Sequence, residues 1–225
     1  MKIYHIKNKQ VIAVKNKSGE FLKAYSSNTL DKPRNAFVDI HGKIVAVFDQ
    51  KVITTDEIWI VIERQFLDRL KRHLEKYLSL SGTTLSAINL SVYYDLESDL
   101  AAEKGDVIIS QKIGRLVLTS RQIDPNVTDG EFTKFRLKND LPLQGVDYDE
   151  ELILNVADEE FVSYTKGCYL GQEIIARVHH RSKPPKKLTV KFKNKSSQEE
   201  YARMTSKVTD PSTGSELGFL FSSNL

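Results

Sequence analysis

Three short apolar segments followed by one long amphipathic segment constrain the fold of this chain more than any other feature. Residues 37–40, 43–48 and 58–62 have the apolar character of β-strands joined by short turns, which indicates an antiparallel meander. Residues 63–78 then place apolar side chains on one helix face and charged side chains on the other. The apolar face consists of Phe66, Leu67, Leu70, Leu74, Tyr77 and Leu78. Because such a face is buried against a sheet, the sequence predicts an α+β lobe.

Further elements are predicted on both sides of this lobe. Residues 11–14, 88–93, 107–109 and 116–118 read as strands, and residues 20–25 and 131–138 have helical spacing. Phe132 and Phe135 are expected to be the buried side chains of the second helix. The alternation indicates a mixed α+β chain, arranged as one large domain or as two to three small lobes.

Composition narrows the class of protein. The 225 residues are 40% hydrophobic and 28% charged, which is typical of a soluble globular protein. A single cysteine excludes an intramolecular disulfide framework and fits a reducing compartment. The first nine residues lack the apolar run of a secretory signal, and no stretch reaches the ~20 apolar residues that cross a bilayer. We therefore expect a cytoplasmic protein without a membrane segment.

Two oppositely charged runs lie behind the small net charge of +3. Residues 147–160 contain seven acidic residues and no basic one, and residues 177–195 contain eight Lys or Arg and no acidic one. Either run is explained by a solvated face. The basic run would alternatively attract phosphate, polyglutamate or nucleic acid.

The octet K-G-C-Y-L-G-Q-E at residues 166–173 holds the residues with most chemical potential. It contains the only cysteine, Cys168, two residues after Lys166 and three before Gly171. The apolar residues at 174, 175 and 178 predict a helix that starts at about Gly171. A thiol near a helix N-terminus and an ammonium has a lowered pKa, so we expect Cys168 to be unusually acidic. The alternative is a small buried side chain, the usual role of a lone cysteine.

This octet resembles the K-G-C-[YF]-x-G-Q-E signature of the YgfZ-type folate-binding proteins, relatives of the glycine-cleavage T-protein. Residues 177–181 resemble the R-x-H-x-R-G segment that follows it, with Ser182 in place of glycine. Residues 21–29 resemble the family's F-L-Q-x-x-x-[ST]-N-D segment, with Lys23 in place of glutamine and Thr29 in place of aspartate. The family is linked to iron–sulfur cluster maintenance and tRNA modification.

The resemblance implies a two-lobed α+β core around a central cleft. Residues 1–183 would form the folate-binding core, in which 1–40 join about 105–183 in one lobe and about 41–104 form a ferredoxin-like lobe. Residues 184–225, which begin with Pro184 and Pro185, would form a shortened C-terminal β domain resembling part of a barrel.

The function implied by the resemblance is that of a folate-binding accessory protein that supports assembly or repair of iron–sulfur enzymes, including those that modify tRNA. Cys168 and Lys166 would carry the chemistry. Tetrahydrofolate or a derivative would contact Gly167, Tyr169, Gly171, Gln172, Glu173, Arg177 and Arg181. The implied partners are iron–sulfur client proteins, together with tRNA or tRNA-modifying enzymes, and the protein would be a monomer.

No metal site is expected from the sequence. A permanent iron–sulfur cluster usually needs four thiolates, and this chain has one. The five histidines lack the spacing of a metal motif, so His179 or His180 is expected to be a polar neighbour of the octet.

Two other functions remain open. One is a folate-dependent aminomethyltransferase of the T-protein type, in which case the chain would be an enzyme. The position that matches the catalytic aspartate of those proteins is Val47, although Asp49 lies on the same face of the predicted strand. The other is a plain RNA-binding protein, an interpretation that rests only on the basic run and lacks a known RNA-binding motif.

Overall fold

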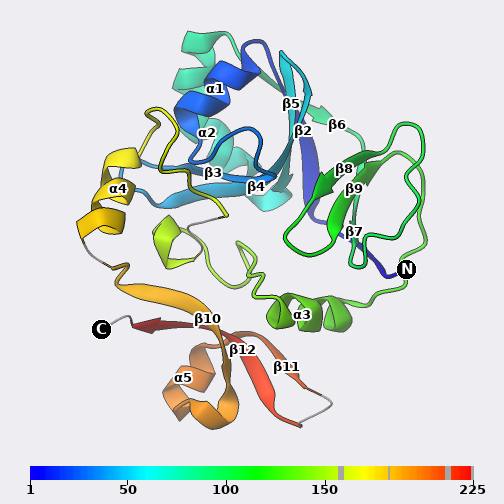
Figure 1. The fold of residues 1–225 in the computed structure, drawn as a ribbon, viewed down its shortest axis with the longest axis vertical. Coiled ribbons are helices and arrows are strands. Elements are labelled where there is room, and N and C mark those ends of the chain that lie inside the picture. Colours follow the sequence, from blue (N-terminus) through cyan, green and yellow to red (C-terminus); the bar gives the residue numbers. More distant parts are fainter. Residues whose placement is uncertain (157–159, 182, 211–213, 224–225) are drawn as a thin grey trace.

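The computed structural model describes the whole chain except residues 157–159, 182, 211–213 and 224–225. The described residues form a mixed α+β fold with three antiparallel sheets (Figure 1). Ser182 and two acids of the acidic run, Asp158 and Glu159, lie outside the described residues.

The first sheet has five strands in the order β3-β4-β5-β2-β6. These are β2 (Lys9–Lys15), β3 (Arg34–Val38), β4 (Ile44–Thr54), β5 (Glu57–Glu63) and β6 (Thr84–Ile88). The predicted strands at 11–14, 43–48 and 58–62 are confirmed, and β3, β4 and β5 pair as the expected antiparallel meander. The strand predicted at 37–40 is displaced, because β3 ends at Val38 and residues 39–40 belong to the turn before β4.

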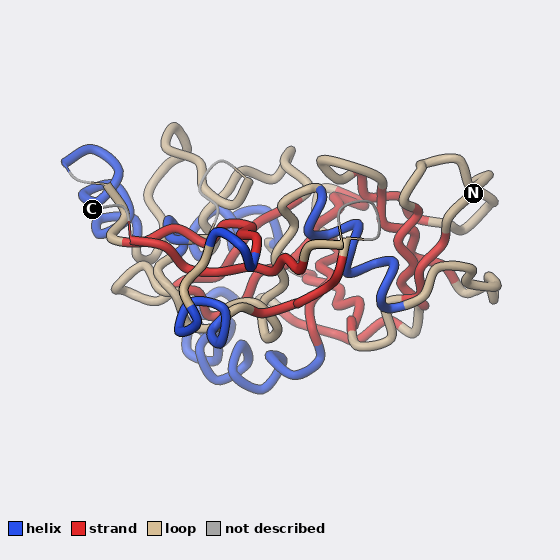
Figure 2. The backbone as a smooth tube through the Cα atoms, turned by 90° about the horizontal axis from the view of Figure 1, so that it is seen from below, coloured by secondary structure: helices blue, strands red, loops and turns tan. Residues whose placement is uncertain are grey.

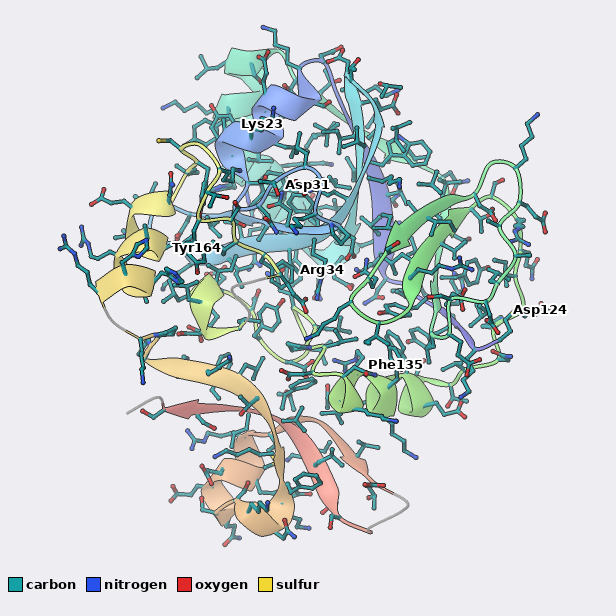
Figure 3. The ribbon with its side chains drawn as sticks, in the orientation of Figure 1. Lys23, Asp31, Arg34, Asp124, Phe135 and Tyr164 are labelled. Carbon is teal, nitrogen blue, oxygen red and sulfur yellow. The ribbon has the colours of Figure 1, made fainter. Side chains whose placement is uncertain are left out.

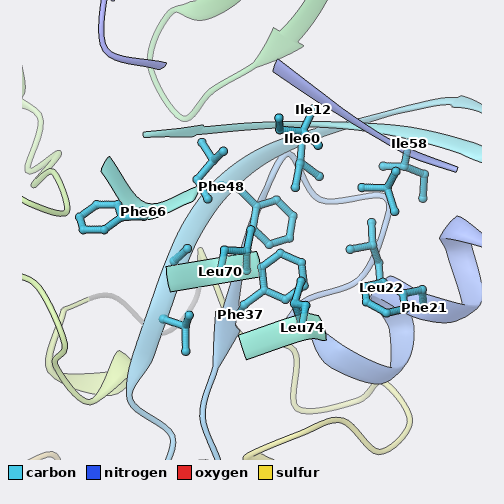
Figure 4. Packing of buried hydrophobic residues seen from close by; sticks show 14 residues of the cluster. Ile12, Phe21, Leu22, Phe37, Phe48, Ile58, Ile60, Phe66, Leu70 and Leu74 are labelled. Carbon is cyan, nitrogen blue, oxygen red and sulfur yellow. The ribbon is translucent and has the colours of Figure 1, made fainter. Parts of the chain in front are cut away.

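Two helices contribute apolar side chains to the core of this sheet, α1 (Ser18–Tyr25) and α2 (Leu67–Ser81), the latter preceded by the turn η1 (Arg64–Phe66). Leu70 and Leu74 of α2 meet Phe37 and Phe48 from the sheet, and the two phenylalanine rings stack at 4.7 Å (Figure 4). Helix α2 ends at Gly82, whose φ of 72° suits glycine. The predicted amphipathic helix is therefore confirmed.

The ferredoxin-like unit begins earlier in the chain than the sequence interpretation placed it, as the order of its elements shows. Strand β2, helix α1, strands β4 and β5, helix α2 and strand β6 follow the β-α-β-β-α-β order of a ferredoxin-like unit, with β3 added at one edge. The unit therefore starts at Lys9, whereas the sequence interpretation started it at about residue 41. Local patterns do not reveal that β2 is inserted between β5 and β6.

The second sheet has the order β1-β7-β9-β8, with β1 (Ile3–His5), β7 (Ser91–Asp95), β8 (Val107–Ser110) and β9 (Arg115–Thr119). The prediction of one strand at 88–93 is wrong. Its first residue ends β6 and its last three lie in β7, because a tight turn in which Leu90 N donates to Ile88 O moves the chain from the first sheet to the second.

Helix α3 (Asp129–Lys138) packs against this second sheet. Thr128 and Glu131 form a capping box that fixes its start. Phe132 is buried as predicted, whereas Phe135 is half-buried.

The third sheet has the order β10-β12-β11, with β10 (Lys186–Phe192), β11 (Thr205–Thr209) and β12 (Glu216–Ser223). The turn η3 (Lys193–Lys195) and helix α5 (Gln198–Arg203) lie between β10 and β11. Over its described residues this sheet is open, so the expected barrel-like piece is not a closed barrel.

A shared core joins the first and third sheets. Val38 and Ile44 of the first sheet, Ile175 of helix α4 (Gln172–Arg181) and Phe219 of the third sheet belong to one buried cluster, to which the turn η2 (Ile153–Asn155) also contributes. The N-terminal residues and the end of β12, the last described strand, lie on opposite sides of the molecule in both views (Figures 1 and 2). Across the described residues, every helix is too short or too polar to span a bilayer.

The described acids of the acidic run link distant parts of the chain, although Asp149 and Glu150 remain exposed to solvent. They pair with basic residues from four separate segments: Asp147 with Arg136, Asp149 and Glu150 with Arg69, Glu151 with Lys186, and Glu160 with Arg34. Half of the basic run is likewise engaged with acids, through Arg177, Lys186, Lys191 and Lys193.

Candidate functional site

A cavity of about 240 Å³ lies between the first sheet, the second sheet and helix α3. Its charged lining consists of Lys9, Arg34, Asp49 and Glu63 from the first sheet and of Asp129 and Arg136 from α3. Arg34 lies near the middle of the molecule, as Figure 3 shows. We call this space the central cavity.

Asp49 is the buried anchor of the cations on one wall of the central cavity. Lys9 Nζ lies 2.6 Å from Asp49 Oδ2, and Arg34 Nε lies 3.8 Å from Asp49 Oδ1. Arg34 also pairs with Glu160, and its guanidinium lies 4.3 Å from the centre of the Phe161 ring. Both cations on this wall are therefore already engaged by protein groups.

Arg136 and Asp147 form a second engaged pair at the junction with the C-terminal sheet. Arg136 Nη1 lies 2.7 Å from Asp147 Oδ2, and both side chains are buried. Asp147 also accepts hydrogen bonds from the hydroxyls of Thr205 and Ser206, and Leu143 N donates to it. This network ties α3 to the start of β11.

Glu63 has no such partner. Its side chain is 5% exposed, no described residue hydrogen-bonds to it, and its Oε2 is fully buried. Burial raises the pKa of Glu63, Lys9 opposes that rise, and Asp49 adds to it. Gln111, which follows β8, also lines the cavity and has a buried amide nitrogen without a partner among the described residues.

Aromatic rings form another wall of the central cavity. Tyr4 stacks on Phe132 at 4.0 Å, and Tyr94 lies 5.4 Å from Phe132. The Tyr4 hydroxyl donates to Asp129 and the Tyr94 hydroxyl to Ile113 O, so their polar ends are already satisfied. The cavity thus offers flat apolar faces beside a few unsatisfied polar groups, the pattern of small-molecule sites.

The outer half of the octet lines a second, more open hollow. Lys166, Gly167 and Cys168 face residues of α1, among them Lys23, and the segment 29–31 across a space of about 640 Å³. Cys168 is exposed, so it is not the buried side chain of the alternative interpretation. We call this space the Cys168 hollow.

Lys166 is held from the α1 side of this hollow. Its ammonium donates to Ser26 O at 2.5 Å and to Asn28 O at 3.1 Å, and it lies 4.9 Å from the centre of the Tyr169 ring. Burial, together with the positive charge of Lys23, lowers the pKa of Lys166 to about 8. The lysine expected to act on Cys168 is instead bound to two backbone carbonyls.

The inner half of the octet fixes the loop to the core. Tyr169 is buried, and Leu170 N donates to Ala24 O. Gly171 has φ +82°, and a Cβ there would lie 2.2 Å from Asp39 O, so this position requires glycine. Gln172 starts α4 and its side chain accepts a hydrogen bond from Tyr169 N. The predicted helix is confirmed, and it begins four residues after Cys168.

The other predicted folate contacts lie on the outer face of α4. Arg177 pairs with Glu173 at 2.7 Å, and the two side chains are 56% and 82% exposed. Arg181 is also exposed, and His179 stacks on Tyr164 at 3.7 Å. The described lining of the central cavity contains none of the predicted contacts. Their role in folate binding stays a prediction.

The sequence interpretation missed Lys9, Arg34, Glu63 and Arg136. Asp49 and Glu63 carried the only available signal, since each is a charged residue within or directly after an apolar strand. Val47 and Asp49 line one recess beside the central cavity, as their shared strand face predicts. No three His, Cys, Asp or Glu side chains gather as a metal site within the described residues.

Comparisons with known proteins give a structural likeness. The fold is similar to the crystal structure of glycine cleavage system aminomethyltransferase T from Bartonella henselae, with a TM-score of 0.74 over 99% of this chain and 78% of that chain. The sequence identity is 13%, so the likeness concerns the fold. No family model matches the sequence. No curated protein matches it either.

Proposed function

We propose that this protein is a folate-binding accessory protein of the YgfZ type, which holds the pterin ring of a reduced folate in the central cavity and supports iron–sulfur enzymes. The observation that carries folate binding is the cavity itself, in which stacked aromatic rings face unsatisfied polar groups inside a fold similar to that of an aminomethyltransferase. A cytoplasmic monomer with iron–sulfur proteins and tRNA-modifying enzymes as partners completes the proposal.

The size of the central cavity suits the ring rather than a whole folate. At about 240 Å³ it is smaller than the ~300–1,000 Å³ usual for drug-sized ligands. The glutamate tail would therefore leave the cavity and remain accessible to solvent. The aromatic wall formed by Tyr4, Phe132 and Tyr94 is suited to contact a fused heteroaromatic ring.

In this proposal the Cys168 hollow has a role separate from folate binding, namely contact with client proteins. An exposed thiol at the rim of an open hollow is accessible to a protein client, as nucleophile, redox group or transient ligand. The signature residues Gly171 and Tyr169 hold that loop in place from the inside. The octet resemblance supports the link to iron–sulfur enzymes and to tRNA modification.

A folate-dependent aminomethyltransferase is the second candidate, and one observation favours it. Asp49 supplies a carboxylate on the cavity wall, two residues after the position where Val47 replaces the catalytic aspartate. However, Lys9 and Arg34 both pair with Asp49, so its carboxylate is already engaged by protein cations. The accessory function is therefore the better supported.

A paired complementation experiment separates the two candidates. In cells that lack this protein, the activity of iron–sulfur enzymes would be restored by the wild type and by Asp49→Asn, but not by Cys168→Ala. Restoration by Cys168→Ala with loss in Asp49→Asn would favour the transferase. Calorimetric titration of the purified protein with tetrahydrofolate tests folate binding directly.

A further inference from the structure

We infer that Glu63 determines which ring the central cavity accepts, by taking hydrogen bonds from the 2-amino group and the adjacent ring N–H of a 2-amino-4-oxo heterocycle. The inference rests on the proposed function, because it assigns a residue to the recognition of that folate ring.

Five of the six described charged side chains that line the central cavity already have a partner within the protein. Lys9 is bound to Asp49, Arg34 to Glu160 and Arg136 to Asp147, while Asp129 accepts from the Tyr4 hydroxyl. Among the described lining residues, Glu63 is the charged group without a hydrogen bond or an ion pair. A ligand with several N–H donors is the chemical complement of this lining.

The carboxyl group of Glu63 is buried at the wall of the central cavity. Glu63 ends β5 and is 5% exposed, so water reaches its carboxyl group little. An unpaired buried carboxylate is energetically costly, and nearby N–H donors remove that cost. Two parallel N–H donors match both carboxylate oxygens, the geometry that makes bidentate pairs strong. The 2-amino group and ring N–H of a pterin offer such a pair.

A hydrogen-bond donor faces the same cavity from the turn that follows β8. Gln111 lines the same cavity, and its Nε2 is buried without a partner among the described residues. In a 2-amino-4-oxo ring, the 4-oxo acceptor lies next to the ring N–H. Glu63 at the end of β5 and Gln111 in the turn after β8 would therefore address neighbouring positions of one ring edge.

The experiment compares two ligands that differ at position 2. Tetrahydrofolate and its 2-desamino-2-methyl analogue are titrated calorimetrically into the wild type, Glu63→Gln, Gln111→Leu and Glu75→Gln. Glu75 is an exposed acid on α2 without a hydrogen bond among the described residues, so Glu75→Gln controls for the change in charge. The wild type should prefer tetrahydrofolate by about tenfold or more, the value of a hydrogen bond to a charged group.

The variants distinguish the contribution of Glu63 from that of Gln111. Glu63→Gln should reduce the preference to about twofold or less, and Glu75→Gln should keep it. Gln111→Leu should weaken both ligands by a similar factor and leave the preference unchanged. Because glutamine has the shape of glutamate, a thermal unfolding midpoint no lower than that of the wild type verifies that Glu63→Gln is folded.

The contrary outcomes are distinct. A wild type that binds neither ligand overturns the proposed folate function and this inference together. A wild type that binds both ligands equally, or a Glu63→Gln variant that keeps the wild-type preference, overturns the role of Glu63 alone and leaves folate binding intact.

Discussion

Lys9 reaches past its own cross-strand neighbour to bind Asp49. In the register of β2 and β5 the residue opposite Lys9 is Glu63, yet Lys9 Nζ lies 2.6 Å from Asp49 Oδ2 on β4, the strand beyond β5. The pairing engages Lys9 with Asp49 and leaves Glu63 without an ion pair of its own at the wall of the central cavity. A ligand-free protein therefore carries an unfavourable charge at this point.

Glu63→Gln should stabilise the ligand-free protein at neutral pH. Burial raises the pKa of Glu63, so its contribution to stability is present below the unfolded pKa of about 4.3 and is lost as the pH rises through the folded value. The substitution removes that loss, with an expected gain of about 1–3 kcal/mol. Urea unfolding from pH 4 to pH 8 measures it. The gain should shrink toward pH 4, and a variant less stable than wild type at pH 7 contradicts the assignment.

Lys166 should react as an unusually acidic lysine. Burial lowers its pKa to about 8, so the folded state favours the neutral amine and stability from this group is lost as the pH falls from 10.5 toward 8. NMR titration of isotope-labelled dimethyl-lysines should show one resonance with a midpoint about two units below the others. Lys23→Ala should raise that midpoint, because it removes a repulsive charge. An unchanged midpoint contradicts the contribution of Lys23.

Gly171→Ala should destabilise the protein, and Gly167→Ala provides the matched control. At Gly171 the backbone has φ +82° and a Cβ would meet Asp39 O at 2.2 Å. The left-handed conformation alone costs alanine about 1–2 kcal/mol, and the contact adds to it. At Gly167 no atom lies within 4 Å of the added Cβ. Equal midpoints of thermal unfolding for the two variants would refute this account of the loop.

Arg136→Ala should be among the most destabilising single substitutions. It leaves Asp147 charged and buried, a loss that typically costs about 3–5 kcal/mol. Arg177→Ala removes an arginine from a well exposed ion pair and should change the unfolding free energy little. Chemical denaturation of both variants checks the contrast. A small effect of Arg136→Ala would mean that water reaches Asp147.

Cys168 should be accessible in the folded protein and dispensable for its stability. Its exposed side chain predicts full alkylation without denaturant, followed by mass spectrometry. Cys168→Ala should change the unfolding free energy by less than about 0.5 kcal/mol, as for other exposed sites. If this stable variant also restores iron–sulfur enzyme activity in cells, the role proposed for the thiol is wrong.

The elements that local pattern encodes were predictable from the sequence. Helix α2 and strands β2 to β5 follow from apolar periodicity, and α4 follows from the apolar positions after Gly171. The division into sheets was not predictable in this way, because β2 enters between β5 and β6, and β1 pairs with β7, about ninety residues away in the sequence. The predicted strand at 88–93 failed at Leu90 for the same reason.

The octet could be found from the sequence, whereas the charged wall of the central cavity could not. The octet at 166–173 is contiguous, so a motif reveals it. In contrast, Lys9, Arg34, Asp49 and Glu63 come from four different strands and meet only after the sheet has formed. Each of them is an ordinary single charge in its own segment. Only the tertiary fold brings these four side chains together at the central cavity.

The ion pairs of Asp149 and Glu160 with residues much earlier in the chain indicate an order in which the parts of the fold form. The first sheet is complete once Ile88 has been synthesised, whereas Glu160 and Asp149 must return to Arg34 and Arg69 from much later in the chain. Because domains fold as the chain emerges and distant contacts form slowly, we expect the cavity wall bearing Glu63 to form before α3 covers it. In the nascent chain this wall would then be exposed to solvent. Pulse-labelled hydrogen exchange should protect β5 earlier than α3.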